Sequence, residues 1–555
     1  MQNRKQDYIN KINELTLNNE LNQDQKNLII SILDKFDDND INLHNVYQFL
    51  IKRVKLGFTF DIAPSVDAKQ VAILSKDEKL SFKNSDKDNN VLIIGENYDA
   101  LKNLKVVERE REREQGAANF DVIYIDPPYN TESSLIDGNN LSEKDDISNK
   151  KFIYRDKFSR TGWLNMLNER LIMAHQLLKD DGIIFVSIDD TEHAYLKVLM
   201  DEIFGEENFV ANIVWVSNKK GRQISNSLFS KTYEHILAYG KNVSSIDYEF
   251  SEEWEKLHST MPSIYDEKVV DILEDQYGEF IVQNELHNTA INNFNIYNRP
   301  NLYYPIYVDE NNISTEFKPE LVEIFPPVNG NGVKGVWRWS KEKVEKDKYN
   351  LFVKKSGSTF KIYTKVREFT YKIKDVILSP KITTKSGNNE LVSILKNAEF
   401  NTTKPTELIK LLVMLHPNKN ARVLDFYAGS GTTGHAVLEL NRQDNGNRTF
   451  TLVTNNENNI GIDVCYERLF RINNGKSTDN KTDFKWIEKN KSYLSNLDVF
   501  NIDYYSTKLF ENTSDTKIIK DKFIKMLNDL KIDYSDINTI RILRQLTSLK
   551  PIVKE

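Results

Sequence analysis

The chain has 555 residues, 39% of them hydrophobic and 28% charged, and its formal net charge is −7. That length exceeds what one hydrophobic core usually serves, so we expect two to four domains. One cysteine, eight scattered histidines and no apolar run of about 18 residues exclude a disulfide framework, a cysteine-built zinc site and a membrane-spanning helix, and no metal cofactor is expected.

The N-terminal region, residues 1–60, is predicted to be helical and to serve in assembly. Its first residues, "MQNRKQDYIN", lack the apolar core of a signal peptide, which favours a cytoplasmic protein. After "NQDQ", which can start a helix, apolar residues recur at helical spacing. They are Leu28, Ile29, Ile32, Leu33 and Phe36.

Residues 61–240 begin a run of alternating strands and helices. "NVLIIGENYDALKNL" (90–104) is typical of strand, turn and helix, and "NFDVIYIDPPYN" (119–130) contains the next strand. Between them, "VERERERE" (107–114) alternates in charge, and we expect a solvated helix end or loop there.

Asp126 stands at a point where a strand must end. Val122 to Ile125 form the β-branched and aromatic run of a strand buried on both faces. Pro127 and Pro128 have no N–H to donate and a fixed φ, so the chain leaves the sheet extended and stiff. Asp126 is therefore predicted at the carboxyl end of its strand, where open α/β sheets place their chemistry.

Residues 163–204 predict a helix, a glycine turn, a strand and a helix. Leu164, Leu167, Leu171 and Ala174 form the helix stripe, and 183–186 the buried strand. Further strands are predicted at 210–216 and 235–239. The alternation indicates an α/β fold with a mostly parallel sheet covered by helices.

Residues 241–375 break this rhythm, and we interpret them as an inserted module. The stretch 334–385 holds 15 lysine and arginine residues but only 5 aspartate and glutamate residues. Aromatic residues are interleaved with these charges, which suits nucleic-acid binding. They are Trp337, Trp339, Tyr349, Phe352, Phe360, Tyr363, Phe369 and Tyr371. A lysine-coated antiparallel sheet with an aromatic core is the equally good alternative.

Residues 376–480 resume the alternation, with a helix at 404–415 and the strand, turn and helix of "VLDFYAGSGTTGHAV". Gly429 and Gly431 permit positive φ in that turn and let a ligand lie against bare backbone, before a helix that starts near Thr432. The spacing is not GxGxxG, which disfavours a dinucleotide. "NNGKS" (473–477) fails as a Walker A loop because Phe470 stands where the first glycine belongs.

Two motifs together carry a family resemblance. "DPPY" (126–129) and "DFYAGSG" (425–431) resemble the catalytic and S-adenosylmethionine motifs of amino-methylating DNA methyltransferases, in the order of the permuted β group. "NTTKPTELI" and "GENYDAL" resemble the family's Lys-Pro motif and the motif before its catalytic strand. The whole chain is most similar to modification (Mod) subunits of type III restriction-modification systems, although "YNTESS" departs from the expected "YNTG".

The resemblance implies a Rossmann-like S-adenosylmethionine-dependent fold with an inserted target-recognition domain (241–375) and helical extensions at 1–60 and 481–555. Asp126 and the Pro127 carbonyl would each accept one N–H of the target amine, Pro128 would stiffen the backbone, and Tyr129 would stack on a base flipped out of the duplex.

The resemblance also implies the cofactor residues. They are Asp425, Phe426, Ala428, Gly429, Ser430, Gly431, Thr432, Glu457 and Lys404, with Thr403 beside Lys404. Glu457 follows the next strand, where an acid commonly binds ribose hydroxyls. An ordinary loop acid is the alternative for Glu457, and a plain helix start for Thr403 and Lys404.

The resemblance implies adenine-N6 DNA methylation by the modification and recognition subunit of a type III system, and Asp rather than Ser before the two prolines favours adenine. Cytosine-N4 methylation and a recognition subunit with incidental methylation are the alternatives. Lys219, Lys220 and Arg222 are candidates for phosphate contacts, with a solvated loop as the alternative. The implied partners are double-stranded DNA, a second copy of the chain and a separate helicase-endonuclease subunit. Residues 1–60 are candidates for subunit contacts, as is the tail containing Ile518, Ile519, Phe523, Met526 and Leu527.

Overall fold

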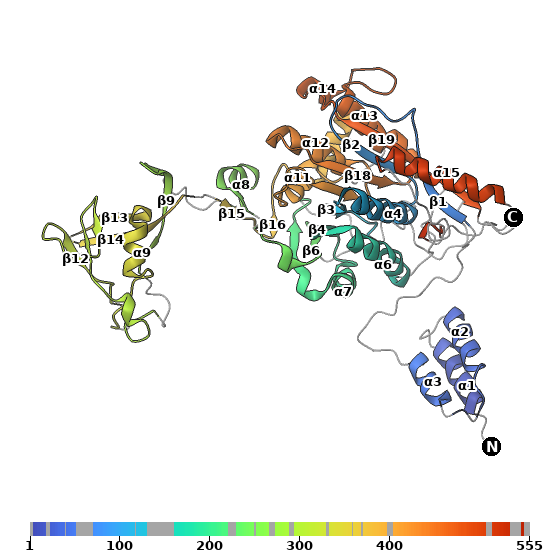
Figure 1. Ribbon diagram of the computed structural model, residues 1–555, viewed down its shortest axis with the longest axis horizontal. Helices are drawn as coiled ribbons and strands as arrows, with labels where there is room; N and C mark the ends of the chain where they lie inside the picture. Colours follow the sequence, from blue (N-terminus) through green and yellow to red (C-terminus); the bar gives the residue numbers. More distant parts are fainter. Residues whose placement is uncertain are drawn as a thin grey trace. The chain divides into compact units, whose positions relative to one another are not determined.

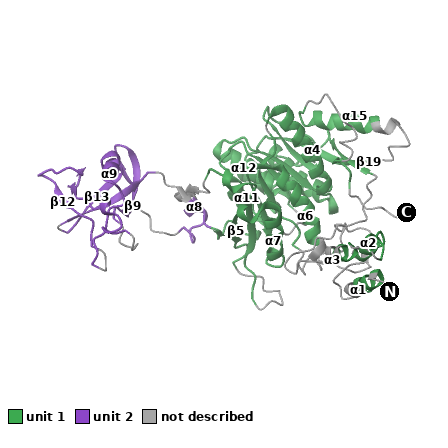
Figure 2. Ribbon diagram, turned by 60° about the horizontal axis from the view of Figure 1, so that its bottom comes forward, with its two compact units in different colours: residues 1–249, 375–555 green, residues 250–374 purple. Residues whose placement is uncertain are grey.

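The structure is a computed structural model of the chain. It describes residues 4–17, 23–38, 40, 42–51, 70–116, 118–129, 160–219, 229–248, 251–265, 272–287, 294–328, 332–357, 359–367, 370–396, 403–506, 513–532 and 545–548. These residues form two compact units, 1–249 with 375–555 and 250–374 (Figure 2).

The first unit is built on one ten-stranded sheet. The strands lie in the order β1-β19-β2-β18-β17-β3-β4-β6-β5-β16. Their bounds are β1 Gln70–Lys76, β2 Asn89–Ile94, β3 Phe120–Ile125, β4 Leu178–Ile188, β5 Phe209–Trp215, β6 Glu234–Gly240, β16 Val376–Ile377, β17 Arg422–Asp425, β18 Thr449–Thr454 and β19 Asn496–Ser506. Every pairing from β19 to β4 is parallel, so the predicted α/β class with a mostly parallel sheet is confirmed.

Helices cover both faces of this sheet (Figure 1). The elements are α4 Asn97–Gln115, α6 Arg160–Leu177, α7 His193–Phe204, α10 Thr384–Leu395, α11 Thr406–Met414, α12 Thr432–Asp444, α13 Glu467–Asn474, α14 Lys485–Lys489 and α15 Thr513–Asp529. Contacts join α4 to α6 and α6 to α7, and contacts also join α11 to α12 and α12 to α13. Each set of helices therefore forms a layer of its own.

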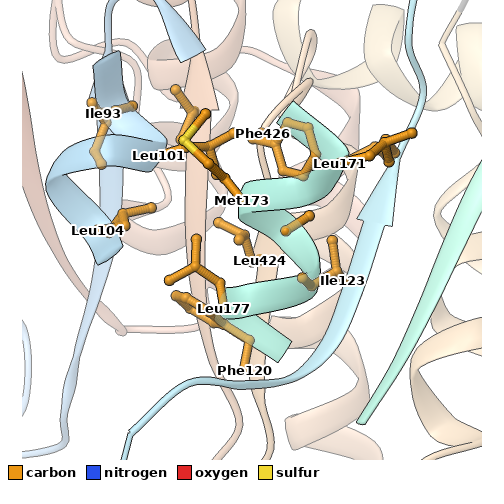
Figure 3. Close-up of a cluster of buried hydrophobic side chains, with 14 of the residues drawn as sticks. Ile93, Leu101, Leu104, Phe120, Ile123, Leu171, Met173, Leu177, Leu424 and Phe426 are labelled. Carbon is orange, nitrogen blue, oxygen red and sulfur yellow. The ribbon is translucent and has the colours of Figure 1, made fainter. Parts of the chain in front are cut away.

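The core beneath α6 follows the predicted helix stripe. Leu167, Leu171 and Ala174 are fully buried, and Figure 3 shows side chains of α4, α6, β3 and β17 converging there. The predicted glycine turn between α6 and the next strand is wrong, because Gly182 lies inside β4. A Cβ atom at Gly182 would meet the Asp121 carbonyl at 3.0 Å, so this glycine permits close strand packing.

The alternating charge run is also different from the prediction. It continues α4, and Glu108 and Glu110 are 2% and 5% exposed. Arg422, at the start of β17, forms an ion pair with Glu108 whose closest atoms are 2.5 Å apart. A cation brought from far along the chain therefore allows a carboxylate to be buried in this run.

The C-terminal region is part of the sheet unit. β19 pairs with β1 and β2, inside the sheet, and α15 contacts β1. Ile519, Phe523, Met526 and Leu527 are buried in this chain's own core, and only Ile518 is half exposed. The prediction that this apolar stripe is available for subunit contacts is therefore wrong for these four residues, because they cover the edge of the sheet.

The second unit is built from short antiparallel sheets. Its elements are β7 Ser251–Glu253, α8 Trp254–Thr260, β8 Leu273–Asp275, β9 Gly278–Glu285, β10 Ile306–Val308, β11 Ile313–Ser314, β12 Val322–Ile324, α9 Lys341–Asp347, β13 Leu351–Ser356, β14 Thr359–Val366 and β15 Thr370–Lys372. Trp337 is buried, and its indole donates to the carbonyl of Tyr304 at 2.8 Å. Tyr349 is exposed, so the aromatics of the basic stretch divide between core and surface.

The N-terminal region forms three helices, α1 Arg4–Leu17, α2 Gln23–Leu33 and α3 Leu43–Ile51, as predicted. Ile29 and Leu33 lie in a small core with Ile12 and Tyr47, but Leu28 is exposed. No helix among the described residues has the length and apolar character that crossing a membrane requires.

Candidate active site

Asp126 lies where the connections after two neighbouring parallel strands run in opposite directions. All six residues of β3 are buried, and Asp126 follows at its carboxyl end. β3 pairs with β17, whose last residue is Asp425. After β3 the chain returns to the sheet at β4 on one side, whereas after β17 it returns at β18 on the other. Such a switch point opens a crevice at the carboxyl ends of the strands, which is where ligands bind in open α/β sheets.

The two prolines after Asp126 are held by an indole. Trp163, in the first turn of α6, donates its Nε1 hydrogen to the carbonyl of Pro128 at 2.5 Å. Trp163 itself is fully buried, and Pro127 is also buried. The strand exit is therefore fixed by its own stiff backbone and by a partly buried hydrogen bond.

Tyr129 and Lys404 form a polar cluster with Asp126 and Glu234. The Tyr129 hydroxyl lies 2.7 Å from Oδ1 of Asp126 and 3.1 Å from Oε2 of Glu234. The Lys404 ammonium donates to Tyr129 at 2.7 Å and lies 2.9 Å from Asp126 and 3.1 Å from Glu234. Three partners thus surround one ammonium group, which has three hydrogens to donate.

Burial and charge act in opposite directions on this cluster. Burial raises the pKa of Asp126, and the ammonium of Lys404 opposes that rise. Burial by itself would lower the pKa of Lys404, but the carboxylates of Asp126 and Glu234 outweigh it and raise the pKa. Burial and the same two carboxylates raise the pKa of the Tyr129 phenol. Lys404 is therefore the cation that offsets two carboxylates in a poorly solvated site.

Asp425 is held rigidly at the start of the glycine turn. It is 2% exposed; its Oδ1 accepts from the backbone N–H of Tyr427 at 2.9 Å and its Oδ2 from the Thr433 hydroxyl at 2.5 Å. Burial raises the pKa of Asp425 to about 7, and the charge of Asp126 adds to that rise. The carboxylates of the two predicted motifs are thus electrostatically coupled.

The glycines in the turn have the backbone conformations that the sequence predicts. Gly429 and Gly431 have φ of 50° and 74°, in the left-handed region. α12 begins at Thr432, and Gly431 at its N-cap provides no side-chain hydrogen bond. The first N–H groups of the helix therefore point toward the turn without a capping side chain from Gly431.

A buried arginine supports the turn from behind. Arg468 is fully buried and donates to Thr432 Oγ1 at 2.8 Å and to Thr406 Oγ1 at 3.0 Å. It also forms an ion pair with Glu390 at 3.1 Å. Arg468 thereby ties α10, α11 and α13 to the first residue of α12.

The other predicted cofactor residues lie around the turn in different settings. The Phe426 side chain is buried in the hydrophobic core, so packing accounts for its ring. Ala428 and Ser430 are buried, and the Ala428 N–H bonds the Val453 carbonyl at 3.0 Å. Glu457 begins the short helix after β18, the strand beside β17. A contact between any of these residues and a cofactor stays a prediction.

Thr403 and Lys404 precede α11 at the site. The Thr403 hydroxyl is buried without a hydrogen-bond partner among the described residues. The Lys404 ammonium contacts Asp126 and Tyr129, so the structure links it to the predicted catalytic motif. Its role in binding the cofactor stays a prediction.

Of the three residues predicted to contact phosphate, one lies among the described residues. Lys219 is exposed in the turn after β5. Lys220 and Arg222 lie outside the described residues.

Two residues of the site were missed by sequence reasoning. Glu234 is the first residue of β6 and is 8% exposed. An acid opening an otherwise apolar strand was the available signal, because a carboxylate seldom enters a sheet without a partner. Trp163 gave no signal beyond being an aromatic residue at the start of a helix.

The donor set fits S-adenosylmethionine. That molecule carries an ammonium and a sulfonium, and the crevice supplies two coupled carboxylates, Asp425 and Asp126, at neighbouring strand ends. Positive-φ glycines and the start of α12 provide bare backbone beside them. Among the described residues, no group of three or more His, Cys, Asp or Glu side chains is arranged to hold a metal ion.

Comparison with protein families gives two matches. The DNA methylase family matches residues 120–497, which contain both strand-end carboxylates and the glycine turn. A family described as an uncharacterised conserved protein matches residues 5–114.

Individual relatives are of two kinds. Type II methyltransferase M.KpnI of Klebsiella pneumoniae is 32% identical over 71% of this chain and 87% of its own length. The type III restriction-modification EcoPI Mod subunit of Escherichia phage P1 is 32% identical over 72% of this chain and 63% of its own. The StyLTI Mod subunit of Salmonella typhimurium is 29% identical over 80% and 67%. The chain thus spans most of the type II enzyme and about two thirds of the two Mod subunits.

Proposed function

The chain belongs to the DNA methylase family, and from this premise we propose that it methylates the N6 amino group of adenine in DNA with S-adenosylmethionine as donor. The observation that carries the proposal is the position of Asp126, held at the switch point beside the Asp425 turn. An aspartate, rather than a serine, before the two prolines favours adenine over cytosine-N4.

The reaction needs a nitrogen lone pair directed at a methyl carbon. An exocyclic adenine amine is a weak nucleophile because its lone pair is delocalised into the ring. Asp126 accepts one amino N–H and the Pro127 carbonyl the other, so the nitrogen can become pyramidal and its lone pair localised. S-adenosylmethionine, when bound, supplies a methyl group already activated by a sulfonium. The protein's task is alignment and stabilisation of positive charge developing on nitrogen, and an ionised Asp126 does both until the surplus amino proton leaves to Asp126 or to solvent.

Tyr129 supports the target base. A base must leave the duplex to reach a strand-end crevice, and an aromatic face compensates for lost stacking. The Tyr129 hydroxyl is anchored by Asp126 and Lys404, and its backbone neighbour Pro128 is anchored by Trp163. This double anchoring fixes the position of the ring beside Asp126.

The second unit, close to the predicted 241–375 module, is proposed to recognise DNA. Lys354 and Lys361 lie opposite each other on β13 and β14, and both are exposed, as is Lys355. Like charges directly opposite on antiparallel strands destabilise a sheet. Lys361 is already paired with Glu285 at 2.7 Å, so a polyanion lying across these strands would bind chiefly the charges of Lys354 and Lys355.

The Mod-subunit relatives support a more specific proposal. We infer that the chain is the modification and recognition subunit of a type III restriction-modification system, acts as a homodimer in the cytoplasm and assembles with a separate helicase-endonuclease subunit. The relatives named as Mod subunits support this reading, whereas the type II relative supports a methyltransferase that acts without a restriction subunit.

The test is to map modified bases on plasmid DNA from cells that express the chain alone, beside cells that express Asp126→Ala. We expect N6-methyladenine at one short motif, on one strand, and none with Asp126→Ala. N4-methylcytosine at that motif would keep the mechanism and refute the adenine assignment. Unmodified DNA from cells whose protein binds S-adenosylmethionine would refute activity of the chain alone.

A further inference from the structure

Lys404 and Glu234 lie at the predicted catalytic motif, although neither belongs to it. Glu234 opens β6, Lys404 precedes α11, and Asp126 follows β3. The side chains of Lys404 and Glu234 are 10% and 11% exposed, whereas that of Asp126 is 25% exposed. Of these three side chains, that of Asp126 is therefore the most accessible to a substrate.

We propose that Lys404 and Glu234 are positioning residues that set the charge of Asp126, so that it meets the target amine as an ionised acceptor. This inference rests on the proposed function for its consequence in catalysis. Lys404 lies 2.9 Å from Asp126 Oδ1 and 3.1 Å from Glu234 Oε2, so one cation is shared between two carboxylates.

This sharing of Lys404 matters because Asp126 would be a poorer acceptor of the amino N–H either without Lys404 or with Lys404 bound to it alone. Without Lys404, a poorly solvated Asp126 facing a second carboxylate would take up a proton and could no longer accept an amino N–H. With Lys404 bound to Asp126 alone, the ammonium would compete with the amine for the same lone pairs. Glu234 gives Lys404 a second acceptor, so that Asp126 stays ionised and Lys404 keeps a partner when the amine arrives.

The aromatic walls favour the same arrangement. The Lys404 ammonium lies 4.8 Å from the centre of the Tyr129 ring and 5.6 Å from that of Trp215. Trp215 pairs with Glu234 across β5 and β6, and its indole bonds the Ile382 carbonyl at 2.8 Å. Ring faces attract a cation, so these two rings help to keep the ammonium where it contacts both carboxylates.

Five charged or titratable groups among the described residues interact with Asp126. They are Lys404, Glu234, Tyr129, Tyr124 and Asp425. Lys404 is the cation in this group, so its replacement and that of Glu234 should shift the ionisation of Asp126 in opposite directions.

The first experiment measures kcat/KM for methylation of DNA against pH at saturating S-adenosylmethionine, which reports groups of the enzyme with cofactor bound and keeps protonation of Asp425 from setting the acidic limb. In Lys404→Gln the acidic limb should move up by about one to three pH units, because an opposite charge is lost. In Glu234→Gln it should move down by about one unit, because a like charge is lost. Lys404→Arg should restore the wild-type limb. Acidic limbs at the wild-type pH in both Gln variants would overturn the proposal, even if both enzymes were slow.

A matched control is available on α11, the helix that follows Lys404. Lys410 is 7% exposed and pairs with Glu407 at 2.7 Å. Lys410→Gln removes a buried lysine charge away from Asp126, and its pH profile should keep the wild-type limb. A limb that moved as in Lys404→Gln would show a general charge effect and overturn the assignment.

The second experiment needs no methylation and so separates this inference from the proposed function. In Lys404→Gln the pKa of Asp126 should be higher in the folded chain than in the unfolded chain. The folded variant then binds one more proton between these two pKa values, so its stability falls as pH rises. The loss of thermal stability relative to the wild type should therefore be larger at pH 8 than at pH 5.5. Asp126→Asn in the same chain should remove that pH dependence. A stability loss that does not change with pH would overturn the charge coupling, whether or not the wild-type protein methylates DNA.

Discussion

The Thr433 hydroxyl donates a hydrogen bond to Oδ2 of Asp425 at 2.5 Å. Thr433 lies in the first turn of α12 and Asp425 at the end of β17. The bond therefore spans the whole glycine turn and joins the strand to the helix. Since the Tyr427 N–H occupies Oδ1, the carboxylate is oriented before any ligand arrives.

Affinity for S-adenosylmethionine should depend on pH through Asp425. Burial raises the pKa of this carboxyl to about 7, so a proton is bound below that pH and the charge that attracts a cationic ligand is lost. The dissociation constant should rise as pH falls below about 7, by up to about tenfold per unit. Isothermal titration between about pH 5.5 and 8 measures it.

Asp425→Asn is the control for this dependence. It removes the titrating group with little change in shape, so binding should be weaker at about pH 8 and nearly independent of pH. A wild-type dissociation constant that does not change over the same pH range would show that the charge of Asp425 does not contribute to binding of S-adenosylmethionine.

Arg468→Met should destabilise the protein strongly. Arg468 is fully buried and paired with Glu390, whose side chain is 29% exposed, so its loss leaves a partly buried carboxylate without its cation. Leaving such a group without its partner costs about 1–3 kcal/mol. Differential scanning calorimetry should show a lower Tm, and binding of S-adenosylmethionine should weaken because Thr432 loses its donor.

The double variant Arg468→Met with Glu390→Leu separates charge from packing. Replacing both partners by apolar residues often restores stability, so its Tm should lie between those of the single variant and the wild type. A double variant less stable than Arg468→Met would mean that the bonds to Thr406 and Thr432 outweigh the buried charge.

Local patterns predicted most of the sheet and both halves of the crevice. The strand before Asp126 and the turn after Asp425 are short, strongly patterned segments whose conformation depends on neighbouring residues. Their adjacency followed from a resemblance of motifs, since no local pattern indicates that β17 pairs with β3. Gly182 shows the limit of turn signals, because glycine serves close packing as well as turns.

Long-range partners account for what the sequence did not predict. Glu234 and Lys404 meet Asp126 only because β6 and α11 begin at the edge of the sheet where β3 ends. Glu108 is buried because Arg422 comes from β17. The apolar stripe of α15 is covered because β1 lies beneath it. In each case a charged residue or an apolar helix face that is typical of a protein surface is buried against a distant part of the chain.

Glu108→Ala should therefore behave unlike its neighbours in the charge run. It leaves Arg422, whose side chain is 26% exposed, without the carboxylate that it binds, at a cost of about 1–3 kcal/mol. Glu112→Ala removes the same charge at an exposed position of α4 and should change stability by less than about 0.5 kcal/mol. Thermal unfolding of the two variants measures the contrast, and equal losses would contradict the burial of Glu108.

The basic surface of the second unit should determine how DNA affinity responds to salt. If Lys354 and Lys355 each contact a phosphate, replacing both by alanine removes two contacts and should lower the slope of log Kd against log salt by about 2. Fluorescence anisotropy with a duplex at several salt concentrations measures this slope. The effect should be similar for unrelated sequences, because phosphate contacts carry no base information.

The control is the pair Lys485→Ala and Lys489→Ala on α14, which removes the same charge from exposed positions of the sheet unit. A change in overall charge alone would affect both double variants equally, whereas direct contact would affect only the pair on β13. Equal slopes in the two variants would mean that DNA does not contact β13 and that its lysines form a solvated surface.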